Sequence, residues 1–302
     1  MRFATIGAAV ALLFAAPSAG AQPAHRRILA DRLRAALVRI AESGPGVIGA
    51  SVIDLRSGER FGVNDTLTFP QGSAIKIPIL VELHRQAGSG RLRLDARADL
   101  RVADQVAGTG VLQHLGDSTS SLSLGDLATL MIVLSDNTAT NILIDQVGMD
   151  RVNATMRELG VPSIRLQRKM IRPRESAAGN ENLARPVDAA SLMSRIARCE
   201  LPVSKERCAA LRRTLEIPKG GPIAASVPAD VRVAWKPGEI EGVSTAWGIV
   251  DLPGAPYVVV AMVNYGDEAV AQRTIRQVAD AAWEYFHVLA RSTPYGVRVP
   301  GN

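Results

Sequence analysis

Ser73 and Lys76 are the first residues along the chain whose types and spacing could support catalysis. They lie three positions apart in FPQGSAIKIPIL (69–80), where turn residues run directly into an apolar helix. Residues at this spacing share one face of a helix, so the amine can lie beside the hydroxyl. A serine becomes a nucleophile when a base takes its proton, and a lysine whose pKa is lowered by burial can act as that base. The alternative is a helix-capping serine followed by a solvated lysine.

A second polar group lies in LSDNTATN (134–141), in a turn between two apolar helices. Here we expect the Ser135 hydroxyl to relay a proton and the Asn137 amide to hold a substrate carbonyl. The alternative is a turn in which Asp136 or Asn137 does no more than cap the next helix.

A third group lies in AWKPGEIEGVSTAWGIV (234–250), which places Lys236 and Gly238 at the end of a strand. A glycine at such a position permits another segment of backbone to approach closely. The lysine would add positive charge to a site formed there.

The elements that must position these groups follow from hydrophobic periodicity. A hairpin is expected over 47–64 around Arg56-Ser57-Gly58. Helices are expected over 25–44, 73–87, 123–134, 138–147, 150–159, 187–198, 206–215 and 268–290, and further strands over 231–235, 243–252 and 257–265. Both ends of the chain are therefore α/β and the middle is all-α, which predicts a two-lobed α+β fold: an antiparallel sheet flanked by the terminal helices, with an inserted helical lobe.

This pattern divides the chain into a leader and two lobes that form one catalytic domain. Residues 1–21 have a basic start, a short apolar stretch and a small-residue cleavage site after Ala21, which are the features of a secretory signal peptide. The α/β lobe is predicted to comprise 22–68 and 217–302, and the all-α lobe 69–216. The apolar stretch is too short to span a membrane, so we expect an exported protein, periplasmic or secreted, without a membrane partner.

Charge and histidine spacing argue against two classes of function. The net charge is +6, but the Lys and Arg residues are scattered and form no basic block, so we expect no nucleic-acid partner. The four histidines, His25, His84, His114 and His287, show no metal-ligand spacing such as H-x-x-x-H. We therefore expect neither a metal nor a cofactor.

Cys199 and Cys208 are the two cysteines of the chain and flank LPVSKER between two apolar-periodic segments. In an oxidising compartment they could form a disulfide that links two helices. Two buried free thiols are the alternative.

The order S-x-x-K, S-D-N, K-x-G resembles the class A β-lactamases and the related penicillin-binding peptidases, a motif set associated with that family. The resemblance extends over roughly residues 25 to 290 in motif order, spacing and lobe pattern. It implies Ser73 as the acylated nucleophile, Lys76 as its proton partner and Ser135 as a proton relay to the leaving nitrogen. It also implies Asn137 as a contact to the substrate amide and Lys236 as an anchor for the substrate carboxylate.

The resemblance further implies an oxyanion hole and exposes a departure in the last motif. The hole would use the backbone N–H of Ser73 and one from residue 239 or 240. In this chain K-T-G is replaced by Lys236-Pro237-Gly238, so the threonine hydroxyl is absent and the proline removes a backbone donor. Ser244 and Thr245 are the nearby hydroxyls that could compensate.

A second departure concerns the glutamate that activates the deacylating water in class A enzymes. It lies two residues after an arginine, with an asparagine four residues further on. In LQRKMIRPRESAAGNENLARP (166–186), counting from Arg168 places Met170 at that position, whereas Glu175 comes five residues later and Asn180 five beyond it. The spacing favours Met170, and Glu175 is then a solvated loop carboxylate. Without a general base, an acyl-enzyme can persist.

Three functions remain open on the sequence. The first is an exported class A β-lactamase-like serine hydrolase that opens β-lactam amides through acyl-Ser73, with slow deacylation. The second is a D,D-peptidase or transpeptidase acting on cell-wall peptides, and the third is a non-catalytic peptidoglycan-binding module. The intact Ser73, Lys76, Ser135 and Asn137 favour the enzymes. We expect a monomer whose partner is a small β-lactam or a cell-wall peptide.

Overall fold

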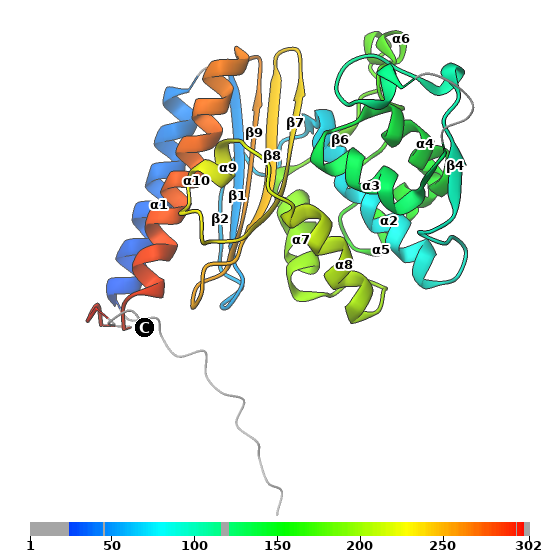
Figure 1. Ribbon diagram of the computed structural model, residues 1–302. Coiled ribbons are helices and arrows are strands. Elements are labelled where there is room, and N and C mark those ends of the chain that lie inside the picture. Colours follow the sequence, from blue (N-terminus) through cyan, green and yellow to red (C-terminus); the bar gives the residue numbers. More distant parts are fainter. Residues whose placement is uncertain (1–23, 45, 116–120, 294, 299–302) are drawn as a thin grey trace, which may run out of the picture.

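The protein is described here by a computed structural model that covers residues 24–44, 46–115, 121–293 and 295–298. Two long helices, a twisted sheet and a group of shorter helices follow one another across the molecule (Figure 1). The predicted signal peptide at 1–21 lies outside the described residues. Among the described residues, no helix is both long and apolar enough to span a membrane.

The central sheet has five antiparallel strands in the spatial order β2-β1-β9-β8-β7. The strands are β1 Val47–Asp54, β2 Arg60–Val63, β7 Val233–Ile240, β8 Val243–Val250 and β9 Tyr257–Asn264. Every residue of β8 is buried, because both faces of the sheet are covered. Strand β7 lies at one edge of the sheet, and this edge faces the helical region (Figure 1).

One face of the sheet is covered by the two terminal helices, α1 Ala24–Ser43 and α10 Glu268–Ala290. Helix α10 is capped at its N-terminus by Asp267, whose carboxylate accepts the backbone N–H groups of Ala269 and Val270. Its buried residues recur at helical spacing and form, with α1 and the outer side chains of the sheet, one of two hydrophobic clusters.

The other face of the sheet shares a second hydrophobic cluster with the helical region. The helices of this region are α2 Lys76–Gly88, α3 Leu124–Val133, α4 Asn137–Val147, α5 Met149–Glu158, α6 Pro173–Ala177, α7 Pro186–Arg198 and α8 Lys205–Glu216. Helix α7 packs directly on the sheet, and α2 runs through the middle of the helical group. Because the cluster crosses from sheet to helices, the position of β7 relative to α2 is held by packing.

The predicted two-lobed α+β architecture is confirmed, with three differences in detail. The helical region also contains short strands, which pair as β3 Phe69–Pro70 with β6 Leu183–Ala184 and as β4 Arg97–Asp99 with β5 Ser121–Ser123. The short helices α6 and α9 Pro222–Ala225 were not predicted. Strand β7 was expected to end near residue 235 but continues to Ile240, so Lys236 and Gly238 lie within it.

Candidate active site

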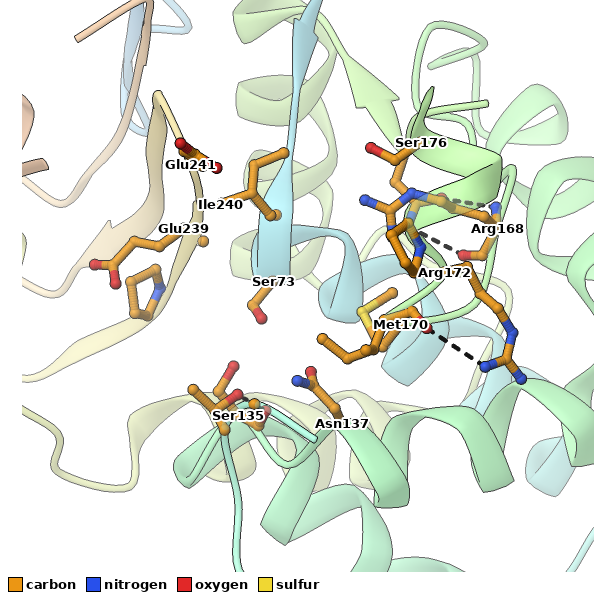
Figure 2. Close-up of a pocket in the computed structure, with 18 of the residues that line it drawn as sticks. Ser73, Ser135, Asn137, Arg168, Met170, Arg172, Ser176, Glu239, Ile240 and Glu241 are labelled. Carbon is orange, nitrogen blue, oxygen red and sulfur yellow. Dashed lines mark hydrogen bonds between the residues drawn. The ribbon is translucent and has the colours of Figure 1, made fainter. Parts of the chain in front are cut away.

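A cavity of about 810 Å³ opens between the edge strand β7 and the helical region. Its lining includes Ser73, Ser135, Asn137, Lys236 and Gly238, five of the residues selected from the sequence. In Figure 2, Ser73 lies between the end of β7 on one side and a loop carrying Met170 on the other, with Ser135 and Asn137 beneath it. The fold thus brings three motifs from distant parts of the sequence around one opening.

The backbone carrying Ser73 is held tightly against β7. Ser73 lies in a turn of 3-10 helix, η1 Gly72–Ile75, that leads into α2. A β-carbon on Gly238 would lie 2.2 Å from the carbonyl oxygen of Gln71, so this close approach requires glycine. Gly72 has a positive φ of 47°, and a β-carbon there would lie 2.6 Å from the backbone nitrogen of Glu239. The Glu239 backbone nitrogen therefore lies beside the turn that presents Ser73, as the expected oxyanion hole requires.

Lys76 is fully buried, and its ammonium group is surrounded by acceptors from the S-D-N turn. Its Nζ lies 2.7 Å from the carbonyl oxygen of Ser135, 3.1 Å from Ser135 Oγ and 2.9 Å from Asn137 Oδ1. Burial, and secondarily the positive charge of Lys236, hold the pKa of Lys76 well below the ordinary value of a lysine, while Asp136 acts in the opposite direction. A lowered pKa makes the neutral amine, which can accept a proton, more accessible.

The Ser135 hydroxyl connects Lys76 to Lys236. The Lys236 amine donates to Ser135 Oγ at 3.0 Å and to the carbonyl oxygen of Pro237 at 3.0 Å. Burial, and secondarily the charge of Lys219, lower the pKa of Lys236 to about 7, against the opposing effect of Glu239. Ser135 has a φ of 54°, a left-handed conformation that is uncommon for residues other than glycine. A single hydroxyl therefore lies within hydrogen-bonding distance of two buried amines.

The two residues that follow Ser135 have different roles in the structure. Asp136 is the N-cap of α4: its Oδ1 accepts the N–H of Ala139 at 2.9 Å and its Oδ2 accepts the N–H of Leu112 at 2.9 Å. The alternative interpretation as a cap is therefore correct for Asp136. Asn137 instead lines the cavity, with its Oδ1 accepting from Lys76 and its Nδ2 donating to the Ala107 carbonyl at 3.3 Å.

Sequence reasoning overlooked the segment 106–110, which supports the S-D-N turn. Gly108 and Thr109 line the cavity. Thr109 Oγ1 donates to the Ser135 carbonyl at 2.7 Å, and the Thr109 carbonyl accepts the N–H of Asn137 at 3.1 Å. The Gly-Thr-Gly string at 108–110 was the available signal, since two glycines so close together predict an irregular backbone.

Neither of the two nearby hydroxyls that could compensate for the missing threonine at Pro237 lines the cavity. Thr245 is buried, and its Oγ1 donates to the Gln71 carbonyl at 3.0 Å. Ser244 is also buried and does not line the cavity. Pro237 itself forms part of the wall. The K-P-G motif therefore offers the cavity a lysine and backbone groups, without a hydroxyl from these two residues.

Met170 lies in the cavity wall and is almost fully buried, with 6% of its surface exposed. Its backbone N–H donates to Asn141 Oδ1 at 2.8 Å, and Asn141 Nδ2 donates to the Met170 carbonyl at 3.2 Å. The loop is closed at its base by Asn182, whose Oδ1 accepts the N–H of Gln167 at 2.8 Å and that of Arg168 at 3.1 Å. A thioether is thereby fixed at the surface that faces Ser73 (Figure 2).

Glu175 lies on α6, where it is exposed and is not part of the cavity lining. Its Oε2 accepts a hydrogen bond from Asn180 Nδ2 at 2.8 Å. The next residue, Ser176, does line the cavity, and its hydroxyl bonds to Glu181. Glu181 in turn pairs with Arg168 at 2.8 Å. The structure thus places Glu175 outside the cavity that Ser73 and Ser135 line.

Cys199 and Cys208 are joined by a disulfide between the end of α7 and the first turns of α8. Cys199 is the left-handed residue that ends α7. Neither cysteine lines the cavity. Within the part of the chain that the structure describes, no group of three or more His, Cys, Asp or Glu side chains is arranged to hold a metal ion.

Comparison with known proteins finds β-lactamases and PBP-A among the relatives of this chain. A sequence model described as the β-lactamase enzyme family matches residues 29–286. β-Lactamase PSE-4 of Pseudomonas aeruginosa is 30% identical over 122 residues, so the match spans 40% of this chain and 42% of that protein. The crystal structure of a β-lactamase from Sphaerobacter thermophilus has a TM-score of 0.77 at 33% identity, covering 85% of this chain and 97% of that one. PBP-A, solved as a leucine-to-glutamate mutant in an acyl-enzyme complex with penicillin G, has a TM-score of 0.76 at 28% identity, covering 86% and 97%.

Proposed function

The chain belongs to the β-lactamase enzyme family, and from this premise we propose that it is an exported serine hydrolase that opens β-lactam amides through an acyl-Ser73 intermediate and releases the acyl group slowly. The observation that carries the proposal is the arrangement of Lys76, Ser135 and Lys236, in which two buried amines share one hydroxyl. Export rests on the leader-like sequence at 1–21.

In the acylation step, neutral Lys76 accepts the Ser73 hydroxyl proton as Ser73 Oγ attacks the carbonyl carbon of the substrate amide. The resulting oxyanion would accept hydrogen bonds from the backbone N–H groups of Ser73 and Glu239. Each such donor typically stabilises the transition state by about 3 kcal/mol. Close packing between Gly238 and the turn at Ser73 fixes the distance between these two donors.

Collapse of this intermediate breaks the carbon–nitrogen bond and leaves the acyl group on Ser73. The leaving nitrogen needs a proton, which the protonated Lys76 would deliver through the Ser135 hydroxyl, 3.1 Å from its Nζ. Charged Lys236 would hold the substrate carboxylate on the same side of the cavity. The proton taken from Ser73 is thus returned to the product, and no external acid is required.

Deacylation needs a water molecule to attack the ester, with a base to take its proton. Met170 lies in the wall where the sequence resemblance places a glutamate, and a thioether cannot act as that base. Glu175 is exposed and outside the cavity lining. The acyl-enzyme should therefore form readily and persist.

The test is the intact mass of the protein after mixing with penicillin G. We expect a single covalent adduct on Ser73 that lasts for minutes or longer after free penicillin is removed. No adduct at saturating penicillin would refute the proposed function, whereas an adduct lost within seconds would refute slow release alone.

A D,D-peptidase or transpeptidase acting on cell-wall peptides is the second candidate. The absence of a carboxylate at Met170 favours it, because a transpeptidase must protect its acyl-enzyme from water until an amine arrives. The structural similarity to PBP-A is compatible with this reading. Release of the terminal residue from a peptide ending in two D-alanines, measured by mass spectrometry, distinguishes the two. A module that only binds peptidoglycan would form no adduct with either compound.

A further inference from the structure

Five charged side chains line the cavity: Arg168, Arg172, Lys236, Glu239 and Glu241. Arg168 is paired with Glu181 at 2.8 Å, and Lys236 donates to Ser135. Among the described residues, Arg172 has no carboxylate partner, and its guanidinium makes one long hydrogen bond of 3.4 Å to the Ile171 carbonyl. It is therefore a cation at the cavity whose charge is not neutralised by a direct ion pair within the part of the chain that the structure describes.

The position of Arg172 depends on the unusual backbone that precedes it. Ile171 has a φ of 55°, which is rare for a β-branched residue. This turn follows Met170, whose backbone N–H and carbonyl both form hydrogen bonds with the side chain of Asn141. As a result, the three consecutive residues 170–172 all line the cavity.

The charges of the cavity are distributed unequally on its two sides. Figure 2 shows Arg168, Met170 and Arg172 on one side of Ser73, and Glu239, Ile240 and Glu241 on the other. An anionic substituent near the end of β7 would face Glu239 and Glu241. Near Arg172 it would instead face an unpaired guanidinium, flanked by apolar side chains of the same loop.

We propose that Arg172 determines specificity by binding a carboxylate on the acyl side chain of the substrate. The inference rests on the proposed function, because it uses the direction in which a substrate would lie. Ser135 and Lys236 receive the leaving nitrogen and its carboxylate, so the acyl portion extends to the opposite side of Ser73, toward the loop. The preferred substrates are then β-lactams or peptides whose acyl side chain combines an apolar group with a carboxylate.

Two penicillins test this pairing because they differ by one group. Carbenicillin is penicillin G with an added carboxylate on the side-chain carbon that bears the phenyl ring. We expect Arg172→Gln to lower the ratio of the second-order acylation rates, carbenicillin over penicillin G, by about two- to fivefold, the size of effect typical for an exposed ion pair. Arg172→Lys should retain part of the ratio, since it keeps the charge but loses the bidentate geometry.

Arg174→Gln is the matched control. Arg174 is an exposed arginine two residues away on α6 that does not line the cavity, and its loss changes the net charge equally. This variant should keep the wild-type ratio. An unchanged ratio in Arg172→Gln, or an equal fall in Arg174→Gln, would overturn the proposal.

Binding of the two penicillins can also be compared in the absence of acylation, in a Ser73→Ala variant. The dissociation constants of carbenicillin and penicillin G are then measured with and without the additional substitution Arg172→Gln. The carbenicillin preference should again fall two- to fivefold. If neither penicillin acylates the wild type, the proposed function fails, and the ratio of dissociation constants still decides the role of Arg172. An unchanged ratio there refutes the assignment.

Discussion

The wall formed by the turn at Ser73, the S-D-N turn and β7 includes Ser135 and Lys236, and these two belong to one hydrogen-bonded group with the buried Lys76 at the start of α2. The facing wall, formed by the loop that carries Met170, presents an apolar side chain held by its backbone. The first wall is buried and contains groups whose pKa is strongly perturbed. In the second wall, Met170 cannot exchange a proton.

This contrast separates the two halves of the proposed reaction. Acylation needs a base, a proton relay and an anchor, and the first wall supplies residues for each. Deacylation needs a base on the other side of the ester. On that side the loop places Met170, which is not a base, while Glu175 is exposed and outside the cavity lining. On the proposed function, this chain would keep the residues for acylation and lack the glutamate that assists deacylation in class A enzymes, and each wall can be tested by itself.

Ser73→Ala should have the largest effect, because it removes the atom to which the acyl group is attached. We expect no covalent adduct with penicillin G over hours, while the circular dichroism spectrum and unfolding midpoint stay close to those of the wild type. The intact mass of the protein provides the measurement. If this variant gained the same mass from penicillin G as the wild type, another residue would be the nucleophile.

Met170→Glu should have the next largest effect, on the second half-reaction alone. A carboxylate at this position, on a backbone that Asn141 holds in the cavity wall, could take a proton from the attacking water. Because a positioned general base typically contributes about 100- to 10,000-fold, the adduct lifetime should fall by a factor in that range. The measurement is the decay of the adduct mass after free penicillin has been removed.

Glu175→Gln is the control for this comparison, since it alters the exposed carboxylate of the same loop. We expect its adduct lifetime to stay within about twofold of the wild type, in keeping with a surface substitution away from the site. A wild type that turns over rapidly, together with a trapped adduct in Glu175→Gln, would show that Glu175 is the base and that the loop rearranges around the substrate.

The pH dependence of acylation should report the two amines of the first wall. In the proposed reaction neutral Lys76 is the base, so below its lowered pKa the rate should fall about tenfold per pH unit as the amine becomes protonated. Lys236 would act as a charged anchor in the same reaction, so substrate binding should weaken as the pH rises through about 7. Acylation at low penicillin concentration should then follow a bell-shaped profile, measured by rapid mixing and mass spectrometry.

Saturating penicillin should shift the alkaline limb to higher pH, because the substrate carboxylate stabilises the protonated form of Lys236. Lys236→Arg should remove that limb, since arginine stays charged throughout the range. An acylation rate that does not vary between pH 5 and 9 would contradict the assigned role of Lys76.

The order and type of the main elements could be predicted because burial imposes clear periodicities on them. Helix α10, for example, was expected over 268–290 and occupies those residues. The extent of β7 was missed because Pro237 and Gly238 resemble a turn. β7 is an edge strand, where a residue without an N–H is tolerated, so the strand continues past both.

For the candidate site, sequence motifs selected residues but not their contacts. The shared hydroxyl of Ser135 depends on a left-handed backbone that the letters S-D-N do not reveal. Thr109 and Arg172 line the cavity through irregular segments that carry no periodic signal. The sequence could suggest Met170 by counting from Arg168, but its placement depends on side-chain contacts with Asn141, which spacing alone does not determine.

The smallest effect on the chemistry should come from removing the disulfide, which lies outside both walls. The double variant Cys199→Ala and Cys208→Ala frees the link between α7 and α8 across a sequence separation of 9. A loop of this size typically contributes about 2–3 kcal/mol to the free energy of unfolding, measured here by urea denaturation. Acylation by penicillin G should stay within about twofold of the wild type, because neither cysteine lines the cavity. A tenfold loss of acylation in the folded variant would show that the position of α2 depends on this link, and that the first wall is less independent than its hydrogen bonds suggest.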